Sequence, residues 1–157
     1  MTNAPSFDWH ITNLRQYMNA TPVQPTSANW SDLELTPLGS ATGGIGLPGD
    51  FSSPSRFVRV AFLRAQILME DIENDGIIEF FHILNNVAMV KGSVITKDGK
   101  DEITQYSSCM NLEKGLYYYK SYNNNQINML DMHKEDLDGS EMKIFPYNDV
   151  QVVNLLY

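Results

Sequence analysis

The sequence predicts an α+β fold in which helices come first along the chain and antiparallel strands follow. Up to residue 90, apolar residues recur at intervals of three and four in several segments, which is typical of amphipathic helices. After Lys91 the pattern changes to alternation of apolar and polar residues, which is typical of strands with one buried face. Because helical and strand patterns do not alternate along the chain, a doubly wound α/β fold is not expected.

Length and composition indicate a single domain. The chain has 157 residues, 43% of them hydrophobic, which is enough to bury a sizeable core. Its net charge of −8 disfavours binding to nucleic acid or to anionic membranes. One cysteine, Cys109, excludes an internal disulfide and, with eight methionines, fits a cytoplasmic location. The first ten residues lack the features of a signal peptide, and no run of 18 apolar residues is present, so no membrane span is expected.

The first helix is expected from residue 6 to about residue 18, with Ser6 as the N-cap. Its apolar residues repeat at helical spacing: Phe7, Ile11, Leu14 and Met18. Residues 19–42 contain three prolines and no sustained period, so a long surface loop is expected there. We expect the loop to be anchored by Trp30, Leu33, Leu35 and Leu38.

A second helix is expected to begin at Pro54 with Ser53 as its N-cap, because the missing N–H of proline costs nothing in a first turn. A third is expected from about residue 76 to residue 90, with a broad apolar face. The strands that follow are expected to form an antiparallel meander. They cover residues 94–96, 102–110, 115–122, 126–132 and 141–147, with a turn at Asp98-Gly99.

The segment GLPGDFSSPSRFVRVAFLR, residues 46–64, places three arginines behind a Pro-Gly turn. Residues 44–49 also match G-x-G-x-x-G, the dinucleotide-binding fingerprint. That motif requires a preceding strand and a helix that starts within it, and neither is expected here. We therefore interpret the glycines as a tight loop in which backbone approaches backbone.

Other chemistry-bearing residues favour structural roles. Cys109 lies on an expected strand without a suitably placed histidine, which is typical of a buried, inert thiol. His10, His82 and His133 lack metal-ligand spacing, so no metal is expected. The acidic residues lack the spacing of a calcium loop and are expected in solvated loops: Glu70, Asp71, Glu73, Asp75, Glu135, Asp136 and Asp138.

Two further alternatives concern single segments. Tyr117, Tyr118 and Tyr119 alternate faces on an expected strand, which is more typical of sheet packing than of a ligand site. Removal of Met1 would expose Thr2, whose α-amine could serve as its own base. That hypothesis predicts an amidase activity that is lost on Thr2→Ala.

Four blocks in order resemble the C-terminal half of the cholylglycine hydrolase family, that is, bile salt hydrolases and penicillin V acylases. They are TNAPSFDWH, GLPGDFSSPSRFVRVAFLR, EFFHILNNVAMVKGS and TQYSSCMNLEKGLYYYKSY, the last followed by NQIN. The resemblance covers nearly the whole chain, 1–157, as a partial domain. It weakens only in the loop near residues 19–40 and over the last ten or so residues.

The resemblance implies half of a four-layer αββα sandwich of the N-terminal nucleophile hydrolase type. Family members cleave the amide between an acyl group and glycine, taurine or a β-lactam nucleus. They use an N-terminal cysteine and no metal or organic cofactor. The implied small-molecule substrate is a conjugated bile salt or a penicillin V-like amide, and the implied full-length assembly is a homotetramer.

Two site residues follow from matching the family motifs. The asparagine of T-N-x-P, which lines the family's oxyanion hole, stands here as Asn3. The arginine beside the nucleophile, in G-L-P-G-D-F-x-x-x-S-R-F, stands as Arg56. A fixed guanidinium near a thiol favours the thiolate and lowers its pKa.

The same resemblance implies that the family's N-terminal half, with its cysteine, is the partner this chain lacks. We therefore expect the isolated chain to be inactive, whether it is a fragment, a split product or a truncated noncatalytic remnant. Bile salts are favoured over penicillin V as the substrate, because the amino-acid sequences of the four blocks resemble those of gut bacterial bile salt hydrolases most.

Overall fold

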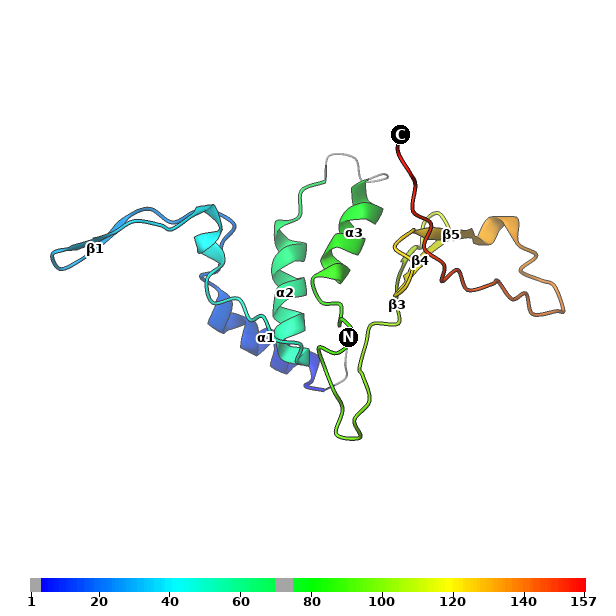
Figure 1. Ribbon diagram of the computed structural model, residues 1–157, viewed down its shortest axis with the longest axis horizontal. Coiled ribbons are helices and arrows are strands. Elements are labelled where there is room, and N and C mark those ends of the chain that lie inside the picture. The colour runs from blue at the N-terminus through cyan, green and yellow to red at the C-terminus, as the bar shows by residue number, and fades with distance from the viewer. Residues whose placement is uncertain (1–3, 70–74) are drawn as a thin grey trace. The chain divides into compact units, whose positions relative to one another are not determined.

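The computed structural model describes residues 4–69 and 75–157 of the chain. The chain divides into two compact units, residues 1–87 and residues 88–157. The first unit holds the helices and a short hairpin, and the second holds a three-stranded sheet. The predicted order of helices first and strands second is therefore confirmed for the main elements (Figure 1).

Helix α1 spans Phe7–Leu14 and continues as a 3-10 turn over Arg15–Tyr17, close to the prediction. Ser6 is the N-cap as expected, because its Oγ accepts the backbone N–H of Trp9 at 3.4 Å. The buried His10 ring stacks on Phe57 of α2, with ring centroids 4.3 Å apart. Aromatic packing thus joins the first two helices.

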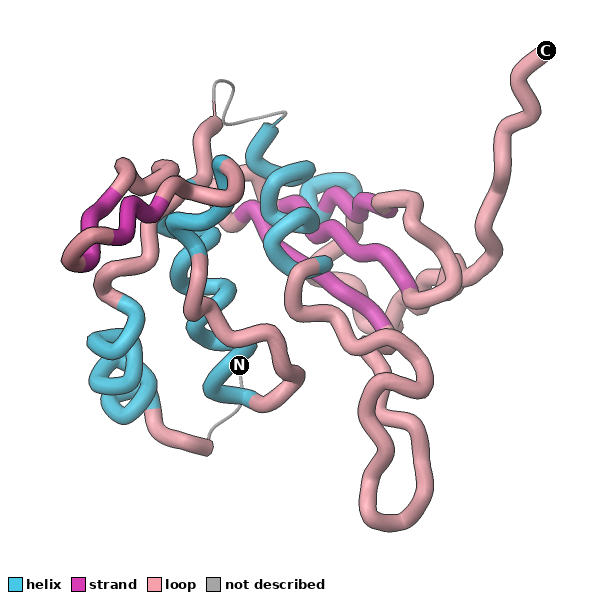
Figure 2. Tube along the Cα trace, turned by 60° about the vertical axis from the view of Figure 1, so that its left-hand side comes forward, coloured by secondary structure: helices cyan, strands magenta, loops and turns pink. Residues whose placement is uncertain are grey.

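Helix α2 spans Ser53–Gln66 and contacts both α1 and α3 (Figure 2). Pro54 lies in its first turn as predicted, but the N-cap is Ser52, one residue earlier than expected. The reason is that Ser52 has extended backbone angles and its N–H is held by the Asp50 carboxylate.

Helix α3 spans Asp75–Asn85 and ends five residues before the predicted end. The backbone N–H groups of Asn86 and Val87 still bond to carbonyls in the last turn of α3. The carbonyls of Asn86 and Val87 instead accept hydrogen bonds from two arginines of α2. Side chains from another helix therefore capture the backbone groups that a longer helix would use.

The segment predicted as an anchored loop contains a hairpin of strands β1 (Ala28–Trp30) and β2 (Leu33–Leu35). The prediction that its large apolar residues anchor it is wrong for three of them. Trp30, Leu33 and Leu38 are exposed, with relative accessibilities of 72%, 60% and 101%. Three-residue strands are too short for their pattern to stand out from a loop.

Strands β3 (Tyr106–Asn111), β4 (Leu116–Ser121) and β5 (Asn128–Asp131) form the predicted antiparallel meander in the order β3-β4-β5. Residues 94–96 make only one isolated bridge, Ile95 to Asp101, around the Asp98-Gly99 turn. The described structure has no strand over residues 141–147. Tyr147 instead stacks on Tyr119 and donates its hydroxyl to the Gln105 carbonyl, so side-chain contacts hold this segment.

Few apolar side chains of the described residues are fully enclosed. Val58, Phe81, Val87 and Met89 are buried, fewer than the sizeable core that composition predicted. Large apolar side chains on the helices and strands are exposed to solvent, for example Phe7 on α1 and Met110 on β3. No helix in the described ranges has the length and apolar character needed to cross a membrane.

Gly43 sits where two backbone segments meet, since the Thr21 N–H donates to the Gly43 carbonyl at 3.0 Å. A Cβ at Gly43 would lie closer than 3.0 Å to the carbonyl oxygens of Thr21 and Val23. We predict that Gly43→Ala lowers the free energy of unfolding by about 1–3 kcal/mol, measured by urea denaturation. Gly39→Ala is the matched control, because a Cβ there meets nothing within 4 Å. Equal losses in both variants would contradict the close-approach interpretation.

Candidate functional site

The site begins at the loop that leads into α2, residues 45–52, which we call the entry loop. Gly46 has φ of +97°, a left-handed conformation that favours glycine. At the end of the loop, Asp50 Oδ1 accepts the Ser52 N–H at 2.8 Å and Oδ2 accepts the Ser55 hydroxyl at 2.5 Å. Hydrogen bonding by the Ser52 side chain first, then by the Ser55 side chain and by the Ser52 N–H, lowers the pKa of Asp50 to about 2. The carboxylate therefore fastens the entry loop to the first turn of α2.

Arg59 joins the entry loop to the segment after α3. Its Nη1 donates to the carbonyls of Pro48 at 2.9 Å and Asp50 at 2.7 Å. Its Nε donates to the carbonyl of Asn86 at 3.2 Å. A single half-buried guanidinium thus holds three backbone carbonyls from two loops.

Arg56 lies one turn before Arg59 on α2 and is also half-buried. Its Nε donates to the carbonyl of Val87 at 3.0 Å. Among the described residues this is the hydrogen bond that the Arg56 side chain makes, so its two terminal NH2 groups remain available as donors. The arrangement can present a fixed cation to an anionic or polar group.

The other predicted site residue, Asn3, lies outside the described residues, and so does Thr2. The structure therefore places Arg56 but leaves the proximity of Asn3 and Arg56 a prediction.

The glycine-rich motif lacks the context of a fingerprint, as expected, because a 3-10 turn over Ser40–Gly44 leads into it and α2 starts only at Ser53. Neither requirement of a dinucleotide fingerprint is met. The interpretation that backbone approaches backbone at its glycines is wrong, because a Cβ at Gly44, Gly46 or Gly49 would meet no backbone atom within 4 Å.

Cys109 lies on β3 opposite Tyr118 and is half-buried. Burial raises the pKa of its thiol, which disfavours the reactive thiolate. The prediction of an inert thiol is consistent with this environment.

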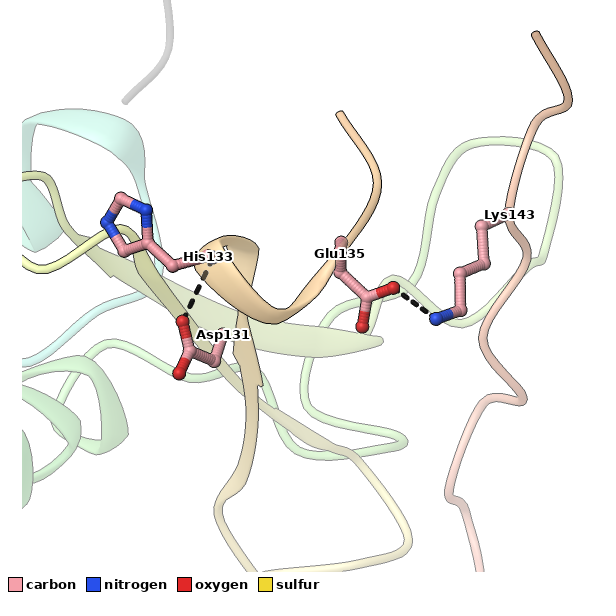
Figure 3. A network of polar contacts seen from close by, with 4 residues as sticks. All are labelled: Asp131, His133, Glu135 and Lys143. Atoms are coloured by element: carbon pink, nitrogen blue, oxygen red, sulfur yellow. Dashed lines mark hydrogen bonds and ion pairs between the residues drawn. The ribbon is translucent and has the colours of Figure 1, made fainter. Parts of the chain in front are cut away.

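The three histidines lie on separate elements: His10 on α1, His82 on α3 and His133 in a 3-10 turn after β5. In the turn, the His133 backbone N–H donates to Asp131 and Glu135 pairs with Lys143 (Figure 3). In the part of the chain that the structure describes, no three His, Cys, Asp or Glu side chains gather as a metal site. Glu70, Asp71 and Glu73 of the first acidic run fall outside that part.

The tyrosines of β4 behave as the alternation predicts. Tyr117 and Tyr119 stack with centroids 6.3 Å apart, whereas Tyr118 lies between them in the strand and pairs with Cys109. Tyr119 stacks in turn on Tyr147. These rings line a shallow pocket of about 240 Å³ together with Tyr106, Leu130, Phe145 and Pro146.

Sequence reasoning did not identify the roles of Arg59 and Asp50. The available signal was the spacing of Arg56 and Arg59, which places two cations on neighbouring turns of one helix face. The acceptors of this pair are backbone carbonyls. Because every residue type has a backbone carbonyl, the sequence does not show which ones the two arginines bind.

Comparison with known protein families gives a match over residues 1–145 to the linear amide C–N hydrolases of the choloylglycine hydrolase family. A bile salt hydrolase/transferase of Clostridium perfringens is 54% identical over 98% of this chain. A bile salt hydrolase/transferase of Lactiplantibacillus plantarum is 41% identical over 93% of it. The chain spans about half the length of these curated relatives, 47% and 45% respectively.

Solved structures agree with these matches. A mutant conjugated bile acid hydrolase from Clostridium perfringens superposes with a TM-score of 0.88 at 53% identity, covering 100% of this chain and 48% of that one. A penicillin V acylase from Agrobacterium tumefaciens has a TM-score of 0.58 at 23% identity, covering 85% of this chain and 36% of that one, which shows a shared fold.

The Asp50 carboxylate provides a test of the entry-loop geometry. Its folded pKa lies below the ordinary value of 3.8, so folding favours the ionised form. Its contribution to stability is therefore present above about pH 4 and is lost as the pH falls towards 2. We predict that NMR titration of the Asp50 carboxyl carbon gives a midpoint of about 2.

Ser55→Ala should raise that midpoint towards the ordinary value, because it removes one hydrogen bond to the ionised form. Ser93→Ala, in the second unit, is the control and should leave the midpoint unchanged. An Asp50 midpoint near 3.8 in the unmodified chain would contradict the observed hydrogen-bond pattern.

Proposed function

Because the chain belongs to the choloylglycine hydrolase family, we propose that it contributes half of an enzyme that hydrolyses bile salts conjugated to glycine or taurine. The observation that carries this proposal is the 54% identity to a bile salt hydrolase/transferase over 98% of the chain. The placement of Arg56 on a rigid support adds to it.

In this proposal, Arg56 lies beside the cysteine thiol of the family's N-terminal half and stabilises its ionised form. An opposite charge within about 4–6 Å stabilises an ionised group, so the guanidinium lowers the pKa of the thiol and raises the thiolate fraction. The Nε–H of Arg56 is engaged by Val87, which leaves the two NH2 groups to face the thiolate and the substrate.

Asn3 is proposed to stabilise the oxyanion. When the thiolate attacks the amide carbonyl, a C–S bond forms and the carbonyl π electrons move to oxygen. The side-chain NH2 of Asn3 would donate to that oxygen, a contact worth about 3 kcal/mol of barrier in acyl-transfer enzymes. The C–N bond then breaks as the glycine or taurine amine takes up a proton, and water cleaves the resulting thioester to release the bile acid.

The chain's own thiol does not supply this nucleophile, because Cys109 lies in β3 with a raised pKa. The isolated chain is therefore expected to be inactive. We further propose a cytoplasmic location, which rests on the single cysteine and the eight methionines. We also propose a homotetrameric full-length assembly, which rests on the family resemblance.

A penicillin V-like amide is the second candidate substrate. Its support is weaker, because the likeness to the penicillin V acylase of Agrobacterium tumefaciens, at 23% identity, concerns the fold alone. Comparing the release of glycine or taurine from conjugated bile salts with the cleavage of penicillin V distinguishes the two substrates.

Complementation tests the proposed function. We predict that the chain, produced together with the N-terminal half of the Clostridium perfringens relative, forms a soluble complex that releases glycine or taurine from conjugated bile salts. Either half alone should show no activity. A soluble complex that yields no product would contradict the proposal.

Within that complex, Arg56→Ala should lower kcat/KM by about 100-fold or more, because the thiolate loses its charge partner. Arg64→Lys is the matched control: it changes an arginine of the same helix outside the site and should stay within about twofold of the unmodified complex. Full activity in Arg56→Ala would remove Arg56 from the mechanism.

A further inference from the structure

The neighbouring Arg59 has an unusual bonding pattern, because its side chain makes three hydrogen bonds and all three go to backbone carbonyls. We infer that Arg59 is a positioning residue for Arg56: it fixes the Asn86 carbonyl and thereby the adjacent Val87 carbonyl that orients the Arg56 guanidinium. The inference rests on the proposed function for its catalytic consequence, but its structural part stands on this chain alone.

The first step concerns the link between the two arginines. Arg59 Nε bonds to the carbonyl of Asn86, and Arg56 Nε bonds to the carbonyl of Val87. These carbonyls are consecutive along the chain and lie in adjacent peptide planes that meet at the Val87 Cα. Holding the Asn86 carbonyl fixes the first plane and thereby the Val87 Cα, from which the plane of the Val87 carbonyl starts. Because the Val87 side chain is buried, few rotations about that Cα remain open.

The second step concerns what else could hold this segment. Helix α3 has ended at Asn85, and the Asn86 side chain bonds back to the His82 carbonyl. Asn86 is exposed, whereas Val87 is buried. The Val87 N–H, which shares a peptide plane with the Asn86 carbonyl, donates to the Leu84 carbonyl at 3.1 Å and holds one side of that plane. Arg59 holds the other side, and in its absence water would bond to the exposed Asn86 carbonyl without holding it in one direction.

The third step concerns the entry loop. Arg59 Nη1 bonds to the carbonyls of Pro48 and Asp50, and the Asp50 carboxylate bonds to Ser52 and Ser55 in and beside the first turn of α2. Arg59 thus ties the segment after α3 to a loop that is itself fastened to α2. Arg56 lies within this closed set of contacts.

The fourth step concerns the chemical type. Nε and Nη1 of a guanidinium lie in one rigid plane and donate in different directions, so they reach carbonyls on two loops at once. A lysine ammonium is a single donor atom on a flexible stem and cannot span both. Arg59→Lys therefore keeps the positive charge but cannot bind carbonyls of both loops at once.

The direct test uses the chain by itself. In ¹⁵N-labelled protein, the Nε–H signal of Arg56 is identified by its loss in Arg56→Lys, and its exchange with water is measured. We expect slow exchange in the unmodified chain, exchange at least tenfold faster in Arg59→Lys, and no change in Arg64→Lys. Arg59→Gln, which keeps an NH2 group without the fork, is the second variant and should also accelerate exchange.

Backbone spectra establish which variants keep the fold, and only those are compared. Unchanged Arg56 exchange in a folded Arg59→Lys or Arg59→Gln chain overturns the inference. Equal acceleration by Arg64→Lys also overturns it, because the effect would then be general to the helix.

The kinetic test uses the complemented enzyme. Arg59→Lys should lower kcat by about tenfold with KM nearly unchanged, and should move the acidic limb of the kcat/KM profile to higher pH. The shift follows because a misplaced Arg56 no longer lowers the pKa of the thiol. An unmoved profile overturns the catalytic part of the inference.

The two tests separate this inference from the proposed function. If the unmodified complex is inactive, the proposed function fails, while Arg56 exchange in the isolated chain still decides the positioning role. If the complex is active and Arg56 exchange does not respond to Arg59, the proposed function stands and the positioning role fails.

Discussion

The capture of two consecutive backbone carbonyls by two arginines of one helix is the interaction on which the first unit depends. Arg56 and Arg59 bond to Val87 and Asn86, directly after α3. These bonds hold the segment that follows α3 against α2. They also hold the entry loop, through the further bonds of Arg59 to Pro48 and Asp50. The position of the candidate site residue Arg56 thus depends on its hydrogen bond to the Val87 carbonyl. It also depends on the Asp50 carboxylate, which binds the entry loop to the first turn of α2.

The main elements could be predicted because their signals are local. Ser6 caps α1 through its own hydroxyl, and Pro54 fits only the first turn of a helix. The N-terminal ends of α1 and α2 could therefore be predicted from a few residues. The meander was predictable from alternation, which depends on each strand having two different faces. The end of α3 was not predictable, because Val87, Ala88 and Met89 continue the apolar pattern while long-range hydrogen bonds stop the helix.

The candidate site likewise contains some residues that the sequence could predict and others that it could not. Asn3 and Arg56 were predicted as site residues through a resemblance to family motifs, and the comparisons establish the family but not these two roles. Arg59 and Asp50 act through backbone carbonyls and N–H groups, which any residue type supplies, so only the structure shows their contacts. The hairpin of residues 28–35 was missed for another reason, since its short strands leave their apolar residues exposed.

A crystal structure of the chain bound to the N-terminal half of the Clostridium perfringens relative tests the account most directly, because it gives the distance from the Arg56 guanidinium to the cysteine sulfur. The account predicts that a terminal nitrogen of Arg56 lies within about 4–6 Å of that sulfur, with Arg56 Nε still bonded to Val87. An Arg56 guanidinium that faces solvent on another surface of the complex would contradict it.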